Sequence, residues 1–216
     1  MLLPGMLGSA LEWSLFRQDA RRYGILAMDL PRGGTLLDMA AVLVPRLPPE
    51  PVTVVGASLG GLVGLSLATL VPGKVRRVVT VGTLPDPRGM PRHIRVVARM
   101  AAWVGASAFD VAYRAHVSRS LGRNQVGGLL RRQLVARAPA RDVWVERVRA
   151  IEAWGLPEVL DVPVVRVLGD HEPSAWVAHF GAGAVRVPGG HFPHISHPAA
   201  LWALLLKLEG QDGVEI

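Results

Sequence analysis

Ser58 is the residue of this chain best placed to do chemistry, because it lies in a G-x-S-x-G pattern at residues 56–60. The pattern directly follows the β-branched run Val52–Val55 and precedes the apolar, helix-like stretch Leu59–Leu70. A strand, a sharp turn and a helix in this order would strain the serine backbone and expose its hydroxyl at a sheet edge. A phosphate-binding glycine turn is the alternative, but its lysine is missing. The pattern predicts a nucleophilic serine.

Three histidines near the end of the chain could take the proton of that serine. His191, His194 and His197 follow the last β-branched run. A base must come within hydrogen-bond distance of the serine hydroxyl, and one loop could present any of the three. Their spacing also suggests metal ligation. Because Pro193 and Pro198 interrupt a regular helical face, we expect no metal site.

An acidic side chain is needed to orient the imidazole and stabilise its charged form. Three carboxylates follow strand-like runs: Asp170 and Glu172 come after residues 162–168, and Asp86 comes after residues 78–81. The residues alone leave the choice open.

Strand-like and helix-like segments alternate along most of the chain. The strand-like runs are residues 24–28, 52–55, 78–81, 162–168 and 184–187, and the helix-like stretches are residues 10–22, 35–47, 59–70 and 198–208. The runs are short and nearly unbroken in apolarity, as in strands buried on both faces. This alternation predicts an α/β fold with a doubly wound, mostly parallel sheet and right-handed crossovers.

The segment from Leu84 to Leu156 departs from this alternation, since helical patterns fill it at residues 92–104, 108–120, 125–138 and 141–154. Ligands of open α/β sheets bind at the carboxyl edge, so we expect this segment to cover that edge as a lid. The predicted division is a core of residues 1–83 and 157–216 with a helical lid insertion of residues 84–156. An ordinary run of surface helices is the alternative.

The positive charge of the chain is concentrated on the predicted lid. The net charge is +7, and residues 84–156 carry thirteen Arg against five Asp and Glu, which leaves −1 for the rest. A one-signed field near a pocket attracts ligands of opposite sign. We therefore expect an anionic or carrier-bound small-molecule substrate, with a solvated helix face as the alternative. Without a binding motif and with only two Tyr, nucleic acid is not expected.

Length and composition limit the remaining classes. A chain of 216 residues suits one domain, and the absence of cysteine excludes disulfides and thiolate chemistry. No apolar run has transmembrane length, and no basic stretch precedes an apolar segment at the start, as a signal peptide would require. We expect a cytoplasmic protein with no membrane partner.

Taken together, the sequence resembles the α/β-hydrolase fold family over nearly its whole length. Residues 2–9 resemble the oxyanion-hole loop of that family, in a variant with Pro4-Gly5 where His-Gly is more frequent. The resemblance implies that the backbone N–H groups of Met6 and Leu59 would bind an oxyanion. Residues 29–33 resemble the turn after the next strand, which we interpret as structural.

The resemblance also implies roles for the candidate base and acid. Residues 189–194 resemble the loop that carries the catalytic histidine, which makes His191 the base. The family places its acid three residues beyond a glycine, so Glu172 is the expected acid, with Asp170 and Asp86 as alternatives. The family usually has two or more strands before the oxyanion loop. This sheet is therefore expected to be minimal or to lack the first strands, with an edge that a homo-oligomer could cover.

The function implied is a serine hydrolase that cleaves an ester, thioester or related acyl bond of a small molecule through a Ser-His-acid triad, without a cofactor. A lyase or cyclase of a biosynthetic pathway stays open, because residues 5–9 and Trp13 also resemble a menaquinone-pathway lyase of the same superfamily. A non-catalytic, hydrolase-like binding protein is a third reading. The complete set of Ser58, His191 and Glu172 disfavours it, since a binding module has no need of all three.

Overall fold

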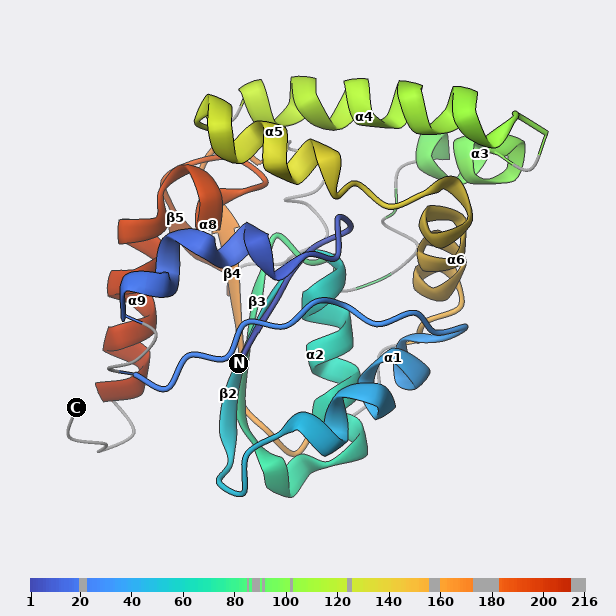
Figure 1. Ribbon diagram of the computed structural model, residues 1–216. Coiled ribbons are helices and arrows are strands. Elements are labelled where there is room, and N and C mark those ends of the chain that lie inside the picture. Colours follow the sequence, from blue (N-terminus) through green and yellow to red (C-terminus); the bar gives the residue numbers. More distant parts are fainter. Residues whose placement is uncertain are drawn as a thin grey trace.

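The computed structural model describes residues 1–19, 23–84, 86, 90, 92–101, 103–123, 126–155, 160–172 and 183–210. Its centre is a five-stranded parallel sheet whose strand order, β1-β2-β3-β4-β5, follows the chain (Figure 1). The strands are β1 (Leu2–Leu3), β2 (Val52–Ala57), β3 (Val75–Val81), β4 (Val164–Gly169) and β5 (Val185–Val187). The predicted α/β class with a parallel sheet is confirmed.

The central strands are buried on both faces, which explains their continuous β-branched composition. In β2, Val54 belongs to one hydrophobic core, while its neighbour Val55 belongs to the core on the opposite face. Val78 and Val79 of β3 divide in the same way, and Val55 pairs with Val79 across the ladder. Alternation of side chains along each strand thus feeds two cores, and each core requires its own layer of helices.

Helices cover both faces of the sheet (Figure 1). One face packs against α1 (Leu36–Leu43) and α2 (Leu59–Leu70), and the other against η1 (Ala10–Asp19) and α9 (Pro198–Gly210). The remaining described helices are η2 (Val44–Arg46), η3 (Pro72–Lys74), α3 (Arg92–Ala101), α4 (Ala106–Arg123), α5 (Gly128–Ala136), α6 (Arg141–Glu152) and α8 (Pro193–Ser196). A doubly wound sheet requires this two-sided cover.

One local prediction was wrong, and one helix takes a different form. Residues 24–28 form no strand but a single bridge between Leu2 and Ala27, because β1 is only two residues long and offers them one pairing position. The helix predicted at residues 10–22 is present from Ala10 to Asp19 and has the 3₁₀ form, and residues 20–22 of that prediction lie outside the described part. Trp13 and Phe16 anchor this segment in the core, so tertiary packing overrides local preference here.

Helices α3 to α6 occupy the segment for which four helical patterns predicted helices, and they lie across the carboxyl end of the sheet (Figure 1). Glu146 of α6 ties the segment to the core, because it accepts from the backbone N–H of Gly33 at 2.8 Å and pairs with Arg32 at 3.0 Å. Within the segment, Asp110 accepts from the backbone N–H of Arg141 at 2.9 Å. These contacts hold the helices above the sheet edge at which β2 and β3 end.

In the described part of the chain, no helix is both long enough and apolar enough to cross a membrane.

Candidate active site

Ser58 lies in a strained turn between β2 and α2. Its backbone angles are φ +48° and ψ −114°, and among the described residues it is the only non-glycine residue with a positive φ. Its N–H donates to the carbonyl of Val81 at 2.8 Å, and its carbonyl accepts from the hydroxyl of Thr83 at 3.0 Å. Neighbouring strand β3 therefore holds the turn in a conformation that an L-residue rarely adopts.

Glycine is required on both sides of this serine. A Cβ at Gly56 would collide with the backbone of Gly60, and a Cβ at Gly60 would collide with the carbonyls of Leu3 and Pro4. Strand β2, helix α2 and the end of β1 thus meet with no room for a side chain. This close approach brings Ser58 next to the loop that follows β1.

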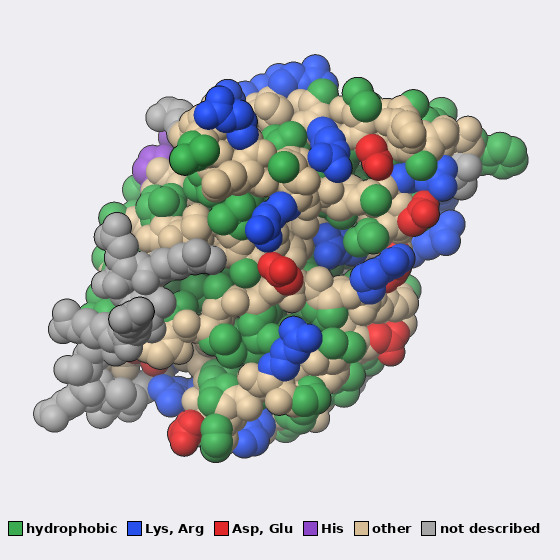
Figure 2. All heavy atoms as spheres, in the orientation of Figure 1, with side chains coloured by type: hydrophobic (Ala, Val, Ile, Leu, Met, Phe, Trp, Pro, Cys, Tyr) green, Lys and Arg blue, Asp and Glu red, His purple; other side chains and the backbone are tan. Residues whose placement is uncertain are grey.

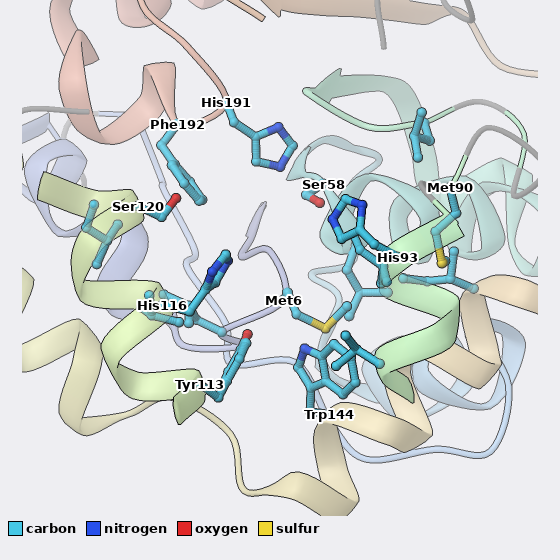
Figure 3. Close-up of a pocket in the computed structure, with 18 of the residues that line it drawn as sticks. Met6, Ser58, Met90, His93, Tyr113, His116, Ser120, Trp144, His191 and Phe192 are labelled. Carbon is cyan, nitrogen blue, oxygen red and sulfur yellow. The ribbon is translucent and has the colours of Figure 1, made fainter. Parts of the chain in front are cut away.

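His191 and Glu172 form a hydrogen-bonded pair from two different loops. Nδ1 of His191 lies 2.7 Å from Oε1 of Glu172, whose side chain is only 1% exposed. The two loops are joined by the N–H of His171, which donates to the carbonyl of Gly189 at 2.9 Å. Because Nδ1 faces the carboxylate, the other ring nitrogen is left to face away from it, and Figure 3 shows the ring near Ser58 at the cavity.

The alternative bases and acids differ from His191 and Glu172 in their burial and in their contacts. His194 is buried and lies 3.4 Å from Glu12, whereas His197 is exposed and contacts Ser196 at 2.9 Å. Of the three histidines, only His191 borders the cavity together with Ser58. Asp170 is exposed at the start of its loop, and Asp86 is half-buried after β3. In the described residues, no group of His, Asp and Glu is arranged to hold a metal ion.

The two residues expected to supply the oxyanion donors, Met6 and Leu59, border the same cavity as Ser58. Leu59 opens helix α2, whose first N–H groups have no partner within the helix and lie at the positive end of its dipole. Met6 lies in the loop after β1 and borders the same cavity. The guanidinium of Arg147 donates to the Met6 carbonyl at 2.7 Å. This bond directs the peptide group between Met6 and Leu7 toward α6 and anchors the loop.

A cavity of ≈ 520 Å³ begins at Ser58 and His191 and extends beneath helices α3, α4 and α6 (Figure 3). Its walls are mainly apolar, and they include Leu62, Leu84, Ile94, Val97, Phe109 and Trp144. Phe109, Tyr113 and Trp144 form an aromatic cluster with ring centroids 5.2–5.9 Å apart. Desolvation in this wall raises the pKa of the Tyr113 phenol, so the residue stays neutral. The cavity suits an apolar chain longer than a methyl or ethyl group.

Several cavity residues were missed by the sequence analysis. Phe109, Tyr113, His116 and Ser120 of α4 all line the cavity, and they recur at helical spacing. That spacing predicts one shared face of the helix but does not say what the face covers. Glu12 was also missed, although an acidic residue beside Trp13 in an apolar region is a usable signal. The arrangement of the cavity walls depends on contacts between segments that are distant in the chain, and for this reason the sequence analysis missed these residues.

These features of fold and site define an α/β-hydrolase, and the comparison with protein families agrees. The model of the alpha/beta hydrolase family matches residues 1–204. The chain belongs to this family of enzymes, as predicted.

Particular relatives support the same placement. The pimeloyl-[acyl-carrier protein] methyl ester esterase of Aromatoleum aromaticum is 30% identical over 196 residues, with 77% of each chain covered. Among solved structures, a hydrolase from Pseudomonas aeruginosa PA01 has a TM-score of 0.74 at 17% identity, and the match covers 97% of this chain and 88% of the chain of that hydrolase. The enol-lactonase from Burkholderia xenovorans LB400 has a TM-score of 0.70 at 19% identity, with 95% and 88% covered. At such identities the solved structures support the fold alone.

Proposed function

We propose that this chain is a serine esterase that hydrolyses an ester or thioester of an acyl chain, with Ser58 as nucleophile, His191 as base and Glu172 as the acid. The observation that carries the proposal is the hydrogen bond of 2.7 Å between His191 and the buried carboxylate of Glu172, at the cavity that Ser58 also borders. A base oriented by a buried carboxylate and placed beside a strained serine is the arrangement that activates a hydroxyl for attack.

In the proposed reaction, Oγ of Ser58 attacks the substrate carbonyl while its proton passes to His191. The N–H groups of Met6 and Leu59 would bind the tetrahedral oxyanion, each contributing about 10²-fold or more in rate. The intermediate then collapses, and the leaving alcohol or thiol takes the proton from His191. A water molecule, deprotonated by His191, attacks the acyl-enzyme and releases the carboxylic acid and free Ser58.

The cavity and the surface favour different parts of the substrate. No Lys or Arg lines the cavity, so its described walls suit an apolar acyl chain. Outside, eight Arg of helices α3 to α6 and their connections are exposed, namely Arg92, Arg99, Arg114, Arg119, Arg123, Arg132, Arg137 and Arg149. Figure 2 shows Lys and Arg side chains over the region where α4 and α5 lie. We infer that the acyl chain enters the cavity while an anionic portion, such as an acidic carrier, stays outside.

The same arrangement supports the interpretation of residues 84–156 as a lid. Helices α3, α4 and α6 supply one side of the cavity, and the core supplies Ser58 and His191 on the other. A substrate held between them would be shielded from water at the reacting carbonyl. The curated relative from Aromatoleum aromaticum, named for an ester on an acyl-carrier protein, is consistent with such a carrier-bound substrate.

The test combines p-nitrophenyl acyl ester turnover with labelling by a fluorophosphonate and mass spectrometry of the labelled peptide. We expect turnover and a single label on Ser58, and we expect Ser58→Ala to lose both, with a rate loss on the order of 10⁴-fold or more. Labelling without turnover of any ester or thioester would favour a lyase or cyclase. Wild-type turnover by Ser58→Ala would exclude the covalent mechanism.

A further inference from the structure

A second histidine–carboxylate pair, Glu12 and His194, lies beneath the active site and has no part in the proposed reaction. Both side chains are at most 1% exposed, and Nε2 of His194 lies 3.4 Å from Oε2 of Glu12. Glu12 belongs to η1 and His194 to α8, so the pair joins the segment after the oxyanion loop to the segment after His191. Burial of ionisable groups is costly unless they are paired, so this pair calls for a physical role.

The carboxylate of Glu12 contacts the oxyanion loop directly. Its Oε2 accepts a hydrogen bond from the N–H of Gly5 at 2.9 Å. A Cβ placed on Gly5 would lie 3.3 Å from that oxygen and 3.5 Å from the Cβ of Ser58, so Gly5 is wedged between the carboxylate and the serine. Glu12 therefore acts on the loop at the residue immediately before the expected oxyanion donor, Met6.

The peptide group between Gly5 and Met6 is held through its own carbonyl, and the peptide groups before and after it are held as well. The Gly5 carbonyl accepts from the N–H of Gly8 at 2.9 Å, and the Met6 carbonyl accepts from Arg147 at 2.7 Å. In a trans peptide the N–H points opposite to the carbonyl, so fixing the Gly5 carbonyl also fixes the direction of the Met6 N–H. With the Gly5 N–H bound to Glu12, the loop has little freedom to turn that donor away from Ser58.

The carboxylate of Glu12 has an imidazole and a guanidinium among its neighbours. His194 packs against Trp13 with ring centroids 4.6 Å apart and ring planes tilted by 35°, which holds the imidazole beside the carboxylate. Burial lowers the pKa of the Arg147 guanidinium, and the negative charge of Glu12 is among the groups that raise it again. Glu12 is thus close enough to Arg147 for its negative charge to act on that guanidinium.

We propose that Glu12 and His194 are positioning residues that hold the oxyanion loop, so that the Met6 N–H is directed at the oxyanion in the transition state. The inference rests on the proposed function, because it assigns the loop an oxyanion. Glu12 borders the cavity, but neither residue forms or breaks a bond in this scheme. Their effect passes through Gly5 and Met6, and it should therefore appear in kcat more than in KM.

The first test compares Glu12→Ala with Glu12→Gln, because glutamine keeps an oxygen that can accept the Gly5 N–H. Since loss of one oxyanion donor costs on the order of 10²–10³-fold, a misdirected donor in Glu12→Ala should lower kcat and the fluorophosphonate labelling rate about 10–100-fold, with KM nearly unchanged. Glu12→Gln should recover kcat to within about five-fold of the wild type. Equal kcat for both variants and the wild type, with only a lower Tm, would overturn the proposal.

The second test removes the imidazole. His194→Phe keeps an aromatic ring against Trp13 but takes away the partner of the Glu12 carboxylate. We expect lower kcat for His194→Phe, and higher kcat for the double variant Glu12→Gln/His194→Phe, because the unpaired carboxylate is gone. His197→Phe is the matched control, since His197 is exposed, and it should behave as the wild type. A double variant no more active than His194→Phe would contradict the pairing. If Glu12→Ala does not fold, the comparison of His194→Phe with the double variant tests the proposal by itself.

A third measurement separates this inference from the proposed function. If the wild type shows neither turnover nor labelling, the proposed function has failed, and amide hydrogen exchange tests the pair by itself. Faster exchange at residues 5–8 in Glu12→Ala than in Glu12→Gln would support the anchoring of the loop. Equal exchange in the two variants would overturn it.

Discussion

The two histidine–carboxylate pairs differ in what surrounds each imidazole. His191 is 24% exposed at the side chain and borders the cavity, so its second nitrogen can meet a substrate or the serine. His194 is 1% exposed and packs between Trp13 and Phe192. The same chemical pair can therefore supply a base at the cavity and an anchor for the loop, because only one of the two imidazoles borders the cavity.

Glu172 and Asp170 provide a sharp comparison at the residue scale. We expect Glu172→Gln to lower kcat on the order of 10³- to 10⁴-fold, because the amide cannot stabilise the charged imidazole and can favour the wrong tautomer. Asp170→Asn should change kcat by less than about three-fold, since its side chain is exposed. Steady-state kinetics on a p-nitrophenyl ester checks both. A larger loss in Asp170→Asn would move the acid by two residues.

At the scale of elements, the close approach of β1, β2 and α2 is what brings the oxyanion loop to Ser58. The backbone of α2 at Gly60 lies against the carbonyls of Leu3 and Pro4, with no space for a methyl group. The loop after β1 and the start of α2 therefore have a fixed separation. Because Met6 lies in that loop and Leu59 opens α2, the distance between the two expected oxyanion donors is fixed as well.

This contact predicts the effect of one methyl group. Gly60→Ala should destabilise the fold by about 1–3 kcal/mol, because the added Cβ must push two backbone segments apart. It should also lower kcat, since Met6 and Leu59 would separate. Gly73→Ala is the matched control, because a Cβ there meets no atom within 4 Å. Thermal unfolding of the two variants checks the difference, and similar Tm values would show that the contact tolerates the methyl group.

At the scale of the whole molecule, the positive charge lies on the exposed surface of residues 84–156, and the apolar cavity lies beneath the helices of that segment. Residues 84–156 carry thirteen Arg and five acidic residues, while the described cavity walls carry no Lys or Arg. A field of this kind raises the local concentration of anions at the surface without requiring them to enter the apolar interior. The arrangement suits a substrate whose charged and apolar parts are separate.

Salt should therefore distinguish substrates. Because the Debye length shrinks to about 10 Å at 0.1 M ionic strength, kcat/KM for an anionic acyl ester should fall as salt is added. A neutral ester with the same acyl chain should respond little, and it serves as the control. Stopped-time assays over a range of ionic strength at constant pH check this. A parallel response of both esters would mean that the surface charge does not guide the substrate.

Short-range features of this chain could be predicted from the sequence because they depend on neighbouring residues. The G-x-S-x-G turn needs glycine where strand and helix touch, and a β-branched run before it and a helix after it are enough to predict a strained serine. The alternation of buried strands and helices likewise predicted the parallel sheet, since hydrophobic periodicity reflects local burial. The strand expected at residues 24–28 failed because its partner, β1, is too short.

Other features required the tertiary structure because they join segments far apart in the chain. Only the tertiary structure shows that Glu172 reaches His191 while Asp170 stays exposed. It also shows that one face of α4 lines the cavity. In the same way, Glu12 contacts His194 although 182 positions of the chain separate the two residues. Sequence spacing constrains which side chains share a strand or a helix face, but not which faces meet. The contacts between these faces are determined by long-range packing, which also determines the shape of the cavity and the direction of its polar groups.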